Sequence, residues 1–320
     1  MQAARRKREQ MPNTPPEYSV VVPVYQSAQS VIELVERTLA VFDNDLKASV
    51  EIILIDDGSD NADTWPTLER LVYQDARVIA VRMMRNFGKP AAVLCGMTYA
   101  RGQWIVTIDD DLQQSPEDIP ALVAQREHDV VVAKYDRKQH SWIVTTTSRI
   151  KRLFDAKVLG LKMPMTPLKL IRRRVIDQML DMRSGRPYIP ALLAHVTSDF
   201  VAVPLQHHAS KAGKSRYNFY RRLRQFSNLV ISNSGVFARI WALLGMLSIL
   251  AGGLAILIAS LFAGWSGITL LLVVMLLLGG SILLALAVVG EYLIRLVELT
   301  SKRPPYVERT VIGRRDVDKS

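Results

Sequence analysis

The chain has 320 residues, 49% of them hydrophobic, and a formal net charge of +11. Its single cysteine, Cys95, excludes an internal disulfide framework. The basic residues gather near the ends and beside an apolar region, which favours anionic lipid headgroups, and no nucleic-acid recognition motif accompanies them. Residues 1–16 are basic and proline-bearing, so we expect a disordered tail rather than a signal peptide.

Five short β-branched runs follow, separated by longer segments with helical periodicity. The strand-like runs are 18–22, 51–55, 78–81, 104–108 and 130–133, and two of the helical segments are 30–42 and 66–73. Apolar strands that alternate with helices predict an α/β fold with a doubly wound, mostly parallel sheet, which we assign to residues 17–216. The sequence contains neither a dinucleotide-binding fingerprint nor a P-loop.

Polar clusters stand at the ends of the first four predicted strands, where ligands bind in such sheets. They are residues 23–25, 56–60, 85–89 and 109–111. Because side chains alternate along a strand, Asp109 and Asp111 are expected to face one pocket. Such oxygen ligands suit Mg²⁺ or Mn²⁺, which usually keep open positions for substrate phosphates. The alternative is an acidic turn that only caps a helix beginning near Pro116.

Residues 236–290 are almost free of charge. Within 239–291, the runs 241–263 and 268–290 are each long enough to cross a hydrocarbon core of about 30 Å, which predicts a two-helix transmembrane hairpin. A pair of buried core helices is the alternative. Arginines and lysines flank the outer ends, so the positive-inside rule places the catalytic domain and both termini in the cytoplasm. We therefore expect a multi-pass protein of the inner (cytoplasmic) membrane.

The segments on either side of this region complete the predicted domain order. Residues 217–238 mix arginines with apolar residues at a spacing typical of an amphipathic helix in the membrane interface. An ordinary surface helix packed on the domain is the alternative there. Residues 292–320 are predicted to form a cytoplasmic C-terminal segment.

A set of motifs then indicates a family. The motifs VVPVYQS, IDDGSDN, RNFGKPAAVLCG, IDDDLQQSPEDI and GKSRYNFYRRL precede the two apolar runs, and GEYLIRLVELTSKRPPYV follows. Over about residues 18–308 this order resembles the polyprenyl-phosphate glycosyltransferases of glycosyltransferase family 2, which include dolichyl-phosphate mannose synthase and undecaprenyl-phosphate glycosyltransferases.

The resemblance implies a GT-A type nucleotide-binding domain with a DXD motif. It also implies inverting transfer of one sugar from a nucleotide sugar, preferably a UDP-sugar, to a polyprenyl phosphate, preferably undecaprenyl phosphate. The reaction would take place at the cytoplasmic face of the membrane, among membrane lipids, and would serve the cell envelope or lipopolysaccharide. The implied cofactor is Mg²⁺ or Mn²⁺, and a homotetramer is implied as the assembly.

Site residues follow from the resemblance by position. It gives catalytic roles to Asp109, Asp111 and Arg216, and metal binding to Asp109, Asp111 and Gln113. The nucleotide sugar would contact Pro23, Tyr25, Asp57, Arg85, Asn86, Lys89, Asp110 and Ser215. The lipid phosphate would contact Lys169, His207, His208 and Lys211.

The sequence departs from the family pattern at two places. Met163 stands where the family has an acid that is its candidate general base, and the 207–213 segment is about one residue short. An attacking lipid phosphate is largely dianionic at neutral pH and needs no strong base. Two other hypotheses stay open: a non-catalytic membrane scaffold or sugar-lipid binding protein, and a processive polysaccharide synthase. The synthase would need more spans and a Q-x-x-R-W motif, and here no tryptophan follows an arginine.

Overall fold

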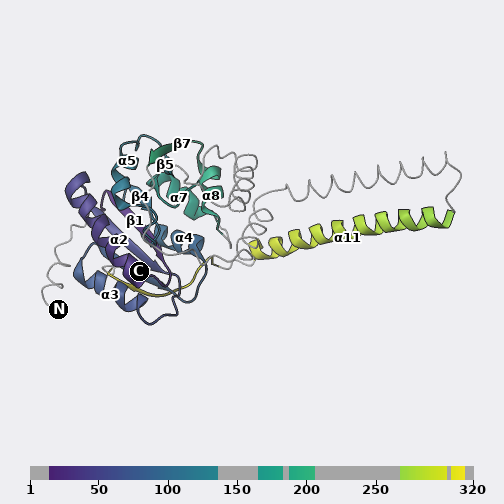
Figure 1. The fold of residues 1–320 in the computed structure, drawn as a ribbon, viewed down its shortest axis with the longest axis horizontal. Coiled ribbons are helices and arrows are strands. Elements are labelled where there is room, and N and C mark those ends of the chain that lie inside the picture. Colours follow the sequence, from purple (N-terminus) through teal and green to yellow (C-terminus); the bar gives the residue numbers. More distant parts are fainter. Residues whose placement is uncertain (1–13, 136–164, 183–186, 206–266, 301–303, 314–320) are drawn as a thin grey trace. The chain divides into compact units, whose positions relative to one another are not determined.

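The computed structural model describes residues 14–135, 165–182, 187–205, 267–300 and 304–313. The chain forms two compact units. Residues 1–216 and 304–320 make up the first unit, and residues 217–303 make up the second. The first unit holds the sheet and its covering helices, and the second contributes the long helix α11, Gly267–Thr300 (Figure 1).

An eight-stranded sheet in the order β7-β5-β6-β4-β1-β2-β3-β8 forms the centre of the first unit, counted over its described residues. The five predicted runs all become strands: β1 Tyr18–Val24, β2 Val50–Asp56, β3 Val78–Met83, β4 Trp104–Thr107 and β5 Val130–Tyr135. Three further strands have no counterpart in the prediction, namely β6 Lys169–Arg172, β7 Phe200–Leu205 and β8 Glu308–Ile312.

The prediction of a mostly parallel sheet needs correction at two strands, one inside the sheet and one at its edge. Strands β4, β1, β2 and β3 are parallel neighbours, and β5 is parallel to β7. However, β6 runs antiparallel to both β4 and β5, and β8 runs antiparallel to β3. These two strands, KLIR and ERTVI, are short and carry charges. Neither sequence contains the continuous apolar run that is typical of a buried strand, so neither strand was predicted. Their antiparallel pairing makes the sheet mixed.

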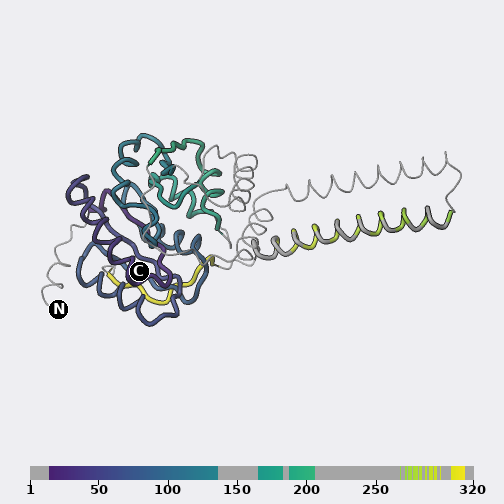
Figure 2. The backbone as a smooth tube through the Cα atoms, in the orientation of Figure 1, coloured from purple at the N-terminus to yellow at the C-terminus, as the bar shows by residue number. Residues whose placement is uncertain are grey.

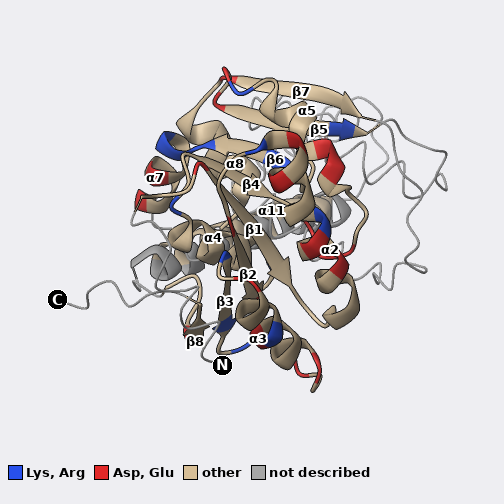
Figure 3. Ribbon diagram, turned by 90° about the vertical axis from the view of Figure 1, so that its left-hand side faces the viewer, with Lys and Arg blue, Asp and Glu red and all other residues tan. Residues whose placement is uncertain are grey.

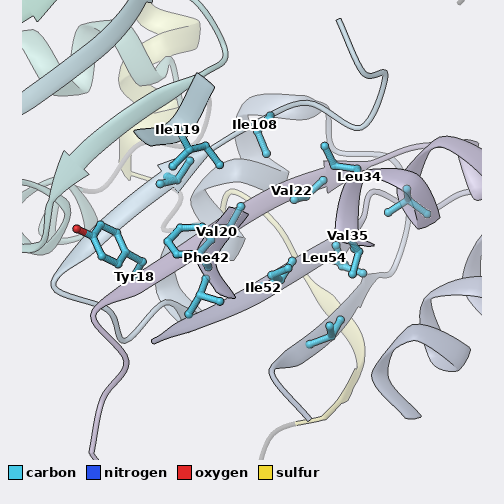
Figure 4. Close-up of a cluster of buried hydrophobic side chains, with 14 of the residues drawn as sticks. Tyr18, Val20, Val22, Leu34, Val35, Phe42, Ile52, Leu54, Ile108 and Ile119 are labelled. Atoms are coloured by element: carbon cyan, nitrogen blue, oxygen red, sulfur yellow. The ribbon is translucent and has the colours of Figure 1, made fainter. Parts of the chain in front are cut away.

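Helices cover both faces of the sheet, as the alternation of side chains along each strand requires. In β1, Val20 and Val22 pack on one face and Val21 on the other, and all three are fully buried. The first face is covered by α2 Ala28–Ala40, α3 Thr64–Gln74 and α5 Ile119–Val123 (Figure 4). The second face is covered by α4 Lys89–Tyr99, α7 Arg173–Asp181 and α8 Ile189–Val196.

Two short helical turns extend this frame. The π-helical turn η1, Val41–Leu46, continues α2, and the 3₁₀ turn η2, Pro116–Asp118, leads directly into α5. Along the strands themselves most residues are uncharged, and the charged residues lie mainly on helices and loops around them (Figure 3). Charged side chains that could take part in a reaction therefore lie mainly in the loops at the ends of the strands.

The predicted membrane segments fall largely outside this description. The segments 217–238 and 241–263 lie outside the described residues, whereas 268–290 lies within α11. Among the described residues, no helix reaches the combination of length and sustained apolar character that crossing a bilayer requires.

Close contact between α4 and the sheet depends on Gly96. A Cβ atom at this position would collide with Cγ1 of Val21 and lie 3.2 Å from Cγ1 of Ile55. Both neighbours are fully buried, β-branched and unable to move aside cheaply.

We therefore expect Gly96→Ala to lower the free energy of unfolding by about 1–3 kcal/mol, despite the better helix propensity of alanine. Thermal unfolding of the purified protein would measure this. Gly267→Ala is the matched control, because a Cβ atom there meets nothing within 4 Å. Equal melting temperatures for the two variants would contradict the packing argument.

Candidate active site at the carboxyl edge of the sheet

Parallel strands bring four polar loops to one edge of the sheet. The chain passes from β1 to β2 on one side and reaches β4 on the other side of β1. In an open α/β sheet, this reversal of strand order opens a crevice beyond the carboxyl ends of the strands. The loops that follow β1, β2, β3 and β4 all end at this edge, so the fold gathers the predicted site residues of these loops there.

The acidic turn after β4 directs its three carboxylates to three different partners. Asp109 forms an ion pair with the ammonium group of Lys89. Asp110 accepts a hydrogen bond from the backbone N–H of Tyr25 at 3.1 Å, and Asp111 accepts one from the N–H of Gln113 at 3.0 Å. Each partner offsets part of the repulsion among adjacent carboxylates.

Strand alternation does not place these carboxylates, which corrects the sequence argument. Strand β4 ends at Thr107, and Asp110 and Asp111 already belong to a turn. Leu112 completes the turn with φ of +54°, a left-handed conformation that costs about 1 kcal/mol or more for such a residue. The turn itself, stabilised from outside, therefore determines where the carboxylates point.

Burial makes the turn a poor site for isolated negative charge. It raises the pKa of Asp110 to about 6, against the opposing effects of hydrogen bonds from Ser27 and Tyr25. Burial also raises the pKa of Asp111, and the neighbouring Asp109 adds to this rise. Carboxylates that are costly to ionise alone favour a bound cation.

The residues of this turn fit a divalent ion. The ammonium group of Lys89 already rests on Asp109, which shows that this carboxylate accepts a cation. Asp109 and Asp111 offer hard oxygen ligands. No three carboxylate, histidine or cysteine side chains within the described ranges converge into a complete metal cage. A site with two protein carboxylates and open positions for substrate phosphates is the arrangement that Mg²⁺ commonly uses.

Asp57, at the end of β2, holds the loop that follows β3. Its two oxygens accept hydrogen bonds from the N–H groups of Phe87, at 2.7 Å, and Gly88, at 2.9 Å. Burial raises the pKa of Asp57 to about 6, although both backbone hydrogen bonds act in the opposite direction. The structure thus gives this residue a positioning role, and its predicted contact with the base stays a prediction.

Gly58 allows the same two loops to touch. It has φ of +65°, and a Cβ atom there would collide with the backbone of Arg85. The guanidinium of Arg85 lies 4.2 Å from the ring centroid of Phe87. Arg85, Asn86 and Lys89 are exposed, as the predicted donor contacts require.

The loop after β1 contributes one exposed ring and several links. Tyr25 is exposed, whereas Pro23 lies inside β1 and is buried, so Pro23 presents no side chain at the surface of the site. Gln26 has φ of +57°, and its N–H donates to Ser59 Oγ at 2.9 Å. Its side-chain amide also contacts Asp60. These links join the loops after β1 and β2.

A second support for the acidic turn was not predicted. Arg37 on α2 donates to Ser115 Oγ at 2.8 Å and to both carboxylate oxygens of Glu117 at 2.9 and 2.6 Å. The guanidinium of Arg37 lowers the pKa of Glu117 to about 2. About 80 residues separate these partners in the sequence, so no local pattern could have revealed them.

Other predicted residues are placed differently or lie outside the description. Lys169 is buried in β6, where its ammonium group donates to the carbonyl of Thr166 at 2.7 Å. In this conformation it serves the backbone, and its lipid-phosphate role stays a prediction. The remaining predicted residues and the departure noted above lie outside the described residues: Ser215, Arg216, His207, His208, Lys211 and Met163.

Two shallow hollows in the described part of the chain lie at the opposite edge of the sheet. One is lined by residues that include Tyr18, Leu46 and Arg126, and the other by residues that include Ser49 and Arg101. Neither contains a predicted site residue. We place the site at the carboxyl edge, because the predicted site residues of four loops converge there.

The sequence as a whole identifies the family of the protein. Residues 19–180 match the model of glycosyl transferase family 2. The chain belongs to glycosyltransferase family 2. The predicted fold class agrees with this assignment: the transferase has the α/β mixed sheet of a GT-A-like domain.

Two curated relatives match this transferase over almost its full length. The undecaprenyl-phosphate 4-deoxy-4-formamido-L-arabinose transferase of Proteus mirabilis (strain HI4320) is 30% identical over 313 residues, which cover 94% of this chain and 96% of that protein. Its counterpart from Enterobacter sp. (strain 638) is 32% identical over 316 residues, with coverages of 94% and 95%. The predicted membership among polyprenyl-phosphate glycosyltransferases is thereby confirmed.

Solved structures also resemble the transferase in part. Glucosyl-3-phosphoglycerate synthase from Mycobacterium tuberculosis, in complex with Mn²⁺, UDP-glucose and phosphoglyceric acid, has a TM-score of 0.49 and 18% identity, covering 72% of this chain and 81% of that one. The mannosyltransferase PcManGT from Pyrobaculum calidifontis, in complex with GDP-mannose and Mn²⁺, has a TM-score of 0.47 and 17% identity, covering 75% and 70%.

The raised pKa of Asp57 predicts that ligand binding depends on pH. Because its folded pKa of about 6 exceeds the usual 3.8, this carboxyl favours the folded state below pH 3.8, and that contribution is lost as pH rises through about 6. The loop needs the opposite form, since only the carboxylate accepts well from both the Phe87 and Gly88 amides.

We therefore expect the affinity for a nucleotide sugar to fall by about fivefold as pH drops below about 6, the effect of losing one hydrogen bond. Equilibrium binding of the donor measures this without interference from the acceptor phosphate. In Asp57→Asn, the affinity for the nucleotide sugar should be low over the whole pH range and should depend less steeply on pH. Parallel pH profiles for the two proteins would exclude Asp57 as the titrating group.

Proposed function

We propose that this glycosyltransferase moves one sugar from a nucleotide sugar, a UDP-sugar, to a polyprenyl phosphate, undecaprenyl phosphate, with inversion at the anomeric carbon. One observation carries the proposal. The acidic turn after β4, Lys89, and the loop whose amides bind Asp57 all lie at the edge where the strand order reverses. The relatives named for undecaprenyl-phosphate sugar transfer support the acceptor class.

Charge complementarity defines the donor position. Asp109 and Asp111 would hold a divalent ion, Mg²⁺ or Mn²⁺, and the diphosphate of the donor would bind at the same place. When bound, the ion would neutralise charge on the departing diphosphate. Lys89 and the exposed Arg85 stand on the same side and add positive charge where that group leaves. Tyr25, exposed at the neighbouring loop, is available to the nucleoside.

The reaction proposed is one displacement. An oxygen of the lipid phosphate forms the new bond to the anomeric carbon while the bond to the nucleoside diphosphate breaks, and the electron pair leaves with the diphosphate. The acceptor is already largely dianionic, since the second pKa of a phosphate monoester is about 6. No side chain has to remove a proton, so methionine at position 163 is compatible with this chemistry.

We further propose that the enzyme is a membrane protein. The acceptor tail stays in lipid while its phosphate meets a soluble donor, so the catalytic unit must work at a bilayer surface. The apolar runs 241–263 and 268–290, with basic residues outside both ends, support a hairpin with the catalytic unit and both termini in the cytoplasm. We place the enzyme in the inner membrane, where it acts in building the cell envelope or lipopolysaccharide.

The surface of α11 supports a lipid environment for this segment. Large apolar side chains are exposed along it at spacings of three or four residues, which places them on one side of the helix: Leu271, Met275, Leu278, Ile282, Leu286, Val289, Leu293 and Leu296. Each is more than half exposed. A row of this length on one helix favours burial in lipid or against other helices.

Transfer is tested with membranes from cells that produce the protein. Labelled nucleotide sugars are supplied one at a time with undecaprenyl phosphate, and label is measured in the lipid phase. We expect one UDP-sugar to label the lipid, in a reaction that stops when divalent ions are chelated. Absence of lipid label with every donor would refute the proposed activity.

In the same assay, Asp109→Asn and Asp111→Asn should each reduce turnover by about a hundredfold or more, because the diphosphate loses its means of charge neutralisation. Asp43→Asn is the matched control. Asp43 is a surface residue paired with Arg77 at 2.6 Å, and breaking an exposed pair costs little. Unchanged turnover in both site variants would exclude a metal-assisted mechanism.

The proposed orientation is tested by cysteine labelling. The native Cys95 is fully buried, so its background reaction is low. A membrane-impermeant maleimide should label Ser266→Cys, which lies between the two apolar runs in the sequence, from the outer side of the inner membrane. Ser320→Cys should label only after permeabilisation. The reverse pattern, or equal labelling of both sites, would contradict the proposed topology.

A further inference from the structure

The C-terminal segment, defined here as residues 304–313, returns to the catalytic unit after the long helix. Its strand β8 pairs antiparallel with β3, with Ala80 opposite Ile312 and Met83 opposite Glu308. In Figure 2 this yellow segment runs beside the lower part of the catalytic unit. Strand β8 thus covers what would otherwise be an open edge of the sheet.

This segment holds the end of β3, where the donor loop begins. We define the donor loop as residues 85–88, between β3 and α4. The N–H of Met84, immediately before the loop, donates to the carbonyl of Val307 at 2.9 Å. The pairing of β3 and β8 shifts register between Arg82 and Met83, so the contact at Met84 lies beyond that irregularity. The entrance of the loop is therefore fixed by a hydrogen bond to the C-terminal segment.

The same segment also holds α4, the helix that follows the donor loop. The hydroxyl of Tyr99 donates to the carboxylate of Glu308, and the hydroxyls of Thr98 and Tyr306 lie 2.9 Å apart. Tyr306 packs against the same buried apolar cluster as Phe87. The C-terminal segment thus contacts the elements on both sides of the donor loop.

The far end of the segment is fixed as well. Gly313 has φ of +92°, and a Cβ atom there would lie 2.6 Å from the carbonyl oxygen of Val78, at the start of β3. Only glycine fits such a close approach with this backbone conformation. In the sequence, six residues, 301–306, separate the end of α11 from Val307. The C-terminal segment is therefore held against β3 near both of its ends.

We infer that the C-terminal segment is a positioning element for the nucleotide sugar, acting through the donor loop. This inference rests on the proposed function for the identity of the donor. The loop presents the Phe87 and Gly88 amides to Asp57, and α4 begins with Lys89 on Asp109. Loosening the entrance of the loop at Met84, or α4 through its far end, displaces these groups together. The effect belongs to donor binding and leaves the chemistry of the reacting atoms intact.

The test uses the full-length protein with the double substitution Tyr99→Phe and Tyr306→Phe. It removes the two tyrosine hydroxyls that link α4 to the C-terminal segment and keeps the rings. We expect faster amide hydrogen exchange in residues 84–91 and a KM for the nucleotide sugar raised by about fivefold or more, with kcat changed less than about twofold. Glu308→Ala should act in the same direction, whereas Glu308→Gln retains an acceptor for Tyr99 and should restore most of the affinity.

Tyr18→Phe is the matched control. Its hydroxyl is also held in a largely buried position, by Arg126 at 3.1 Å, but it lies at the opposite edge of the sheet. It should lower the melting temperature to a similar extent without changing exchange in 84–91 or the donor KM. A double variant with unchanged exchange and unchanged KM would overturn the inference, and so would an equal KM increase in Tyr18→Phe.

The two proposals fail in different ways. If the wild-type enzyme transfers no sugar from any nucleotide donor, the proposed function fails. The exchange measurement still decides the inference, because it reports on the donor loop without turnover. Equal exchange in the double variant and the wild type would then reject the positioning role.

Discussion

The place of β1 between β2 and β4 is the constraint on which the active site depends. Because these strands are parallel, their carboxyl ends meet at one edge, and the chain order reverses there, which is where sheets of this kind bind ligands. Each loop then holds another in place. Asp57 binds the loop after β3, Gln26 is bound by Ser59, and Asp110 binds the backbone of Tyr25. With another strand order, these loops would not lie side by side and the contacts would not form.

The negative charge of the acidic turn is balanced by neighbouring groups of the fold. Three adjacent carboxylates would repel one another, yet each has a partner in the fold: an ammonium group for Asp109 and backbone N–H groups for Asp110 and Asp111. Burial keeps two of these carboxyls difficult to ionise. These carboxyls therefore favour a further cation, as the proposed transfer from a nucleotide sugar requires.

The C-terminal segment relates the remote end of the chain to this chemistry. It contributes an outermost strand of the sheet. Its contacts involve Met84, immediately before the donor loop, and Thr98 and Tyr99, at the far end of the helix that follows the loop. In the proposed function, this segment positions the loop that binds the donor.

The sequence by itself determined the central strands, the acidic turn and the family. Long apolar runs and ordered motifs encode those features locally, and residues 18–22 and 104–108 are examples. It did not reveal β6 and β8, because their sequences are short and charged and become strands only by pairing with strands that are distant in the chain. Only the structure shows that Pro23 and Lys169, both predicted to contact ligands, are buried, and their predicted contacts stay predictions. Tertiary structure alone decided the direction of each carboxylate and the supports from Arg37 and Glu308, because those partners lie far apart in the chain and meet only when the sheet has formed.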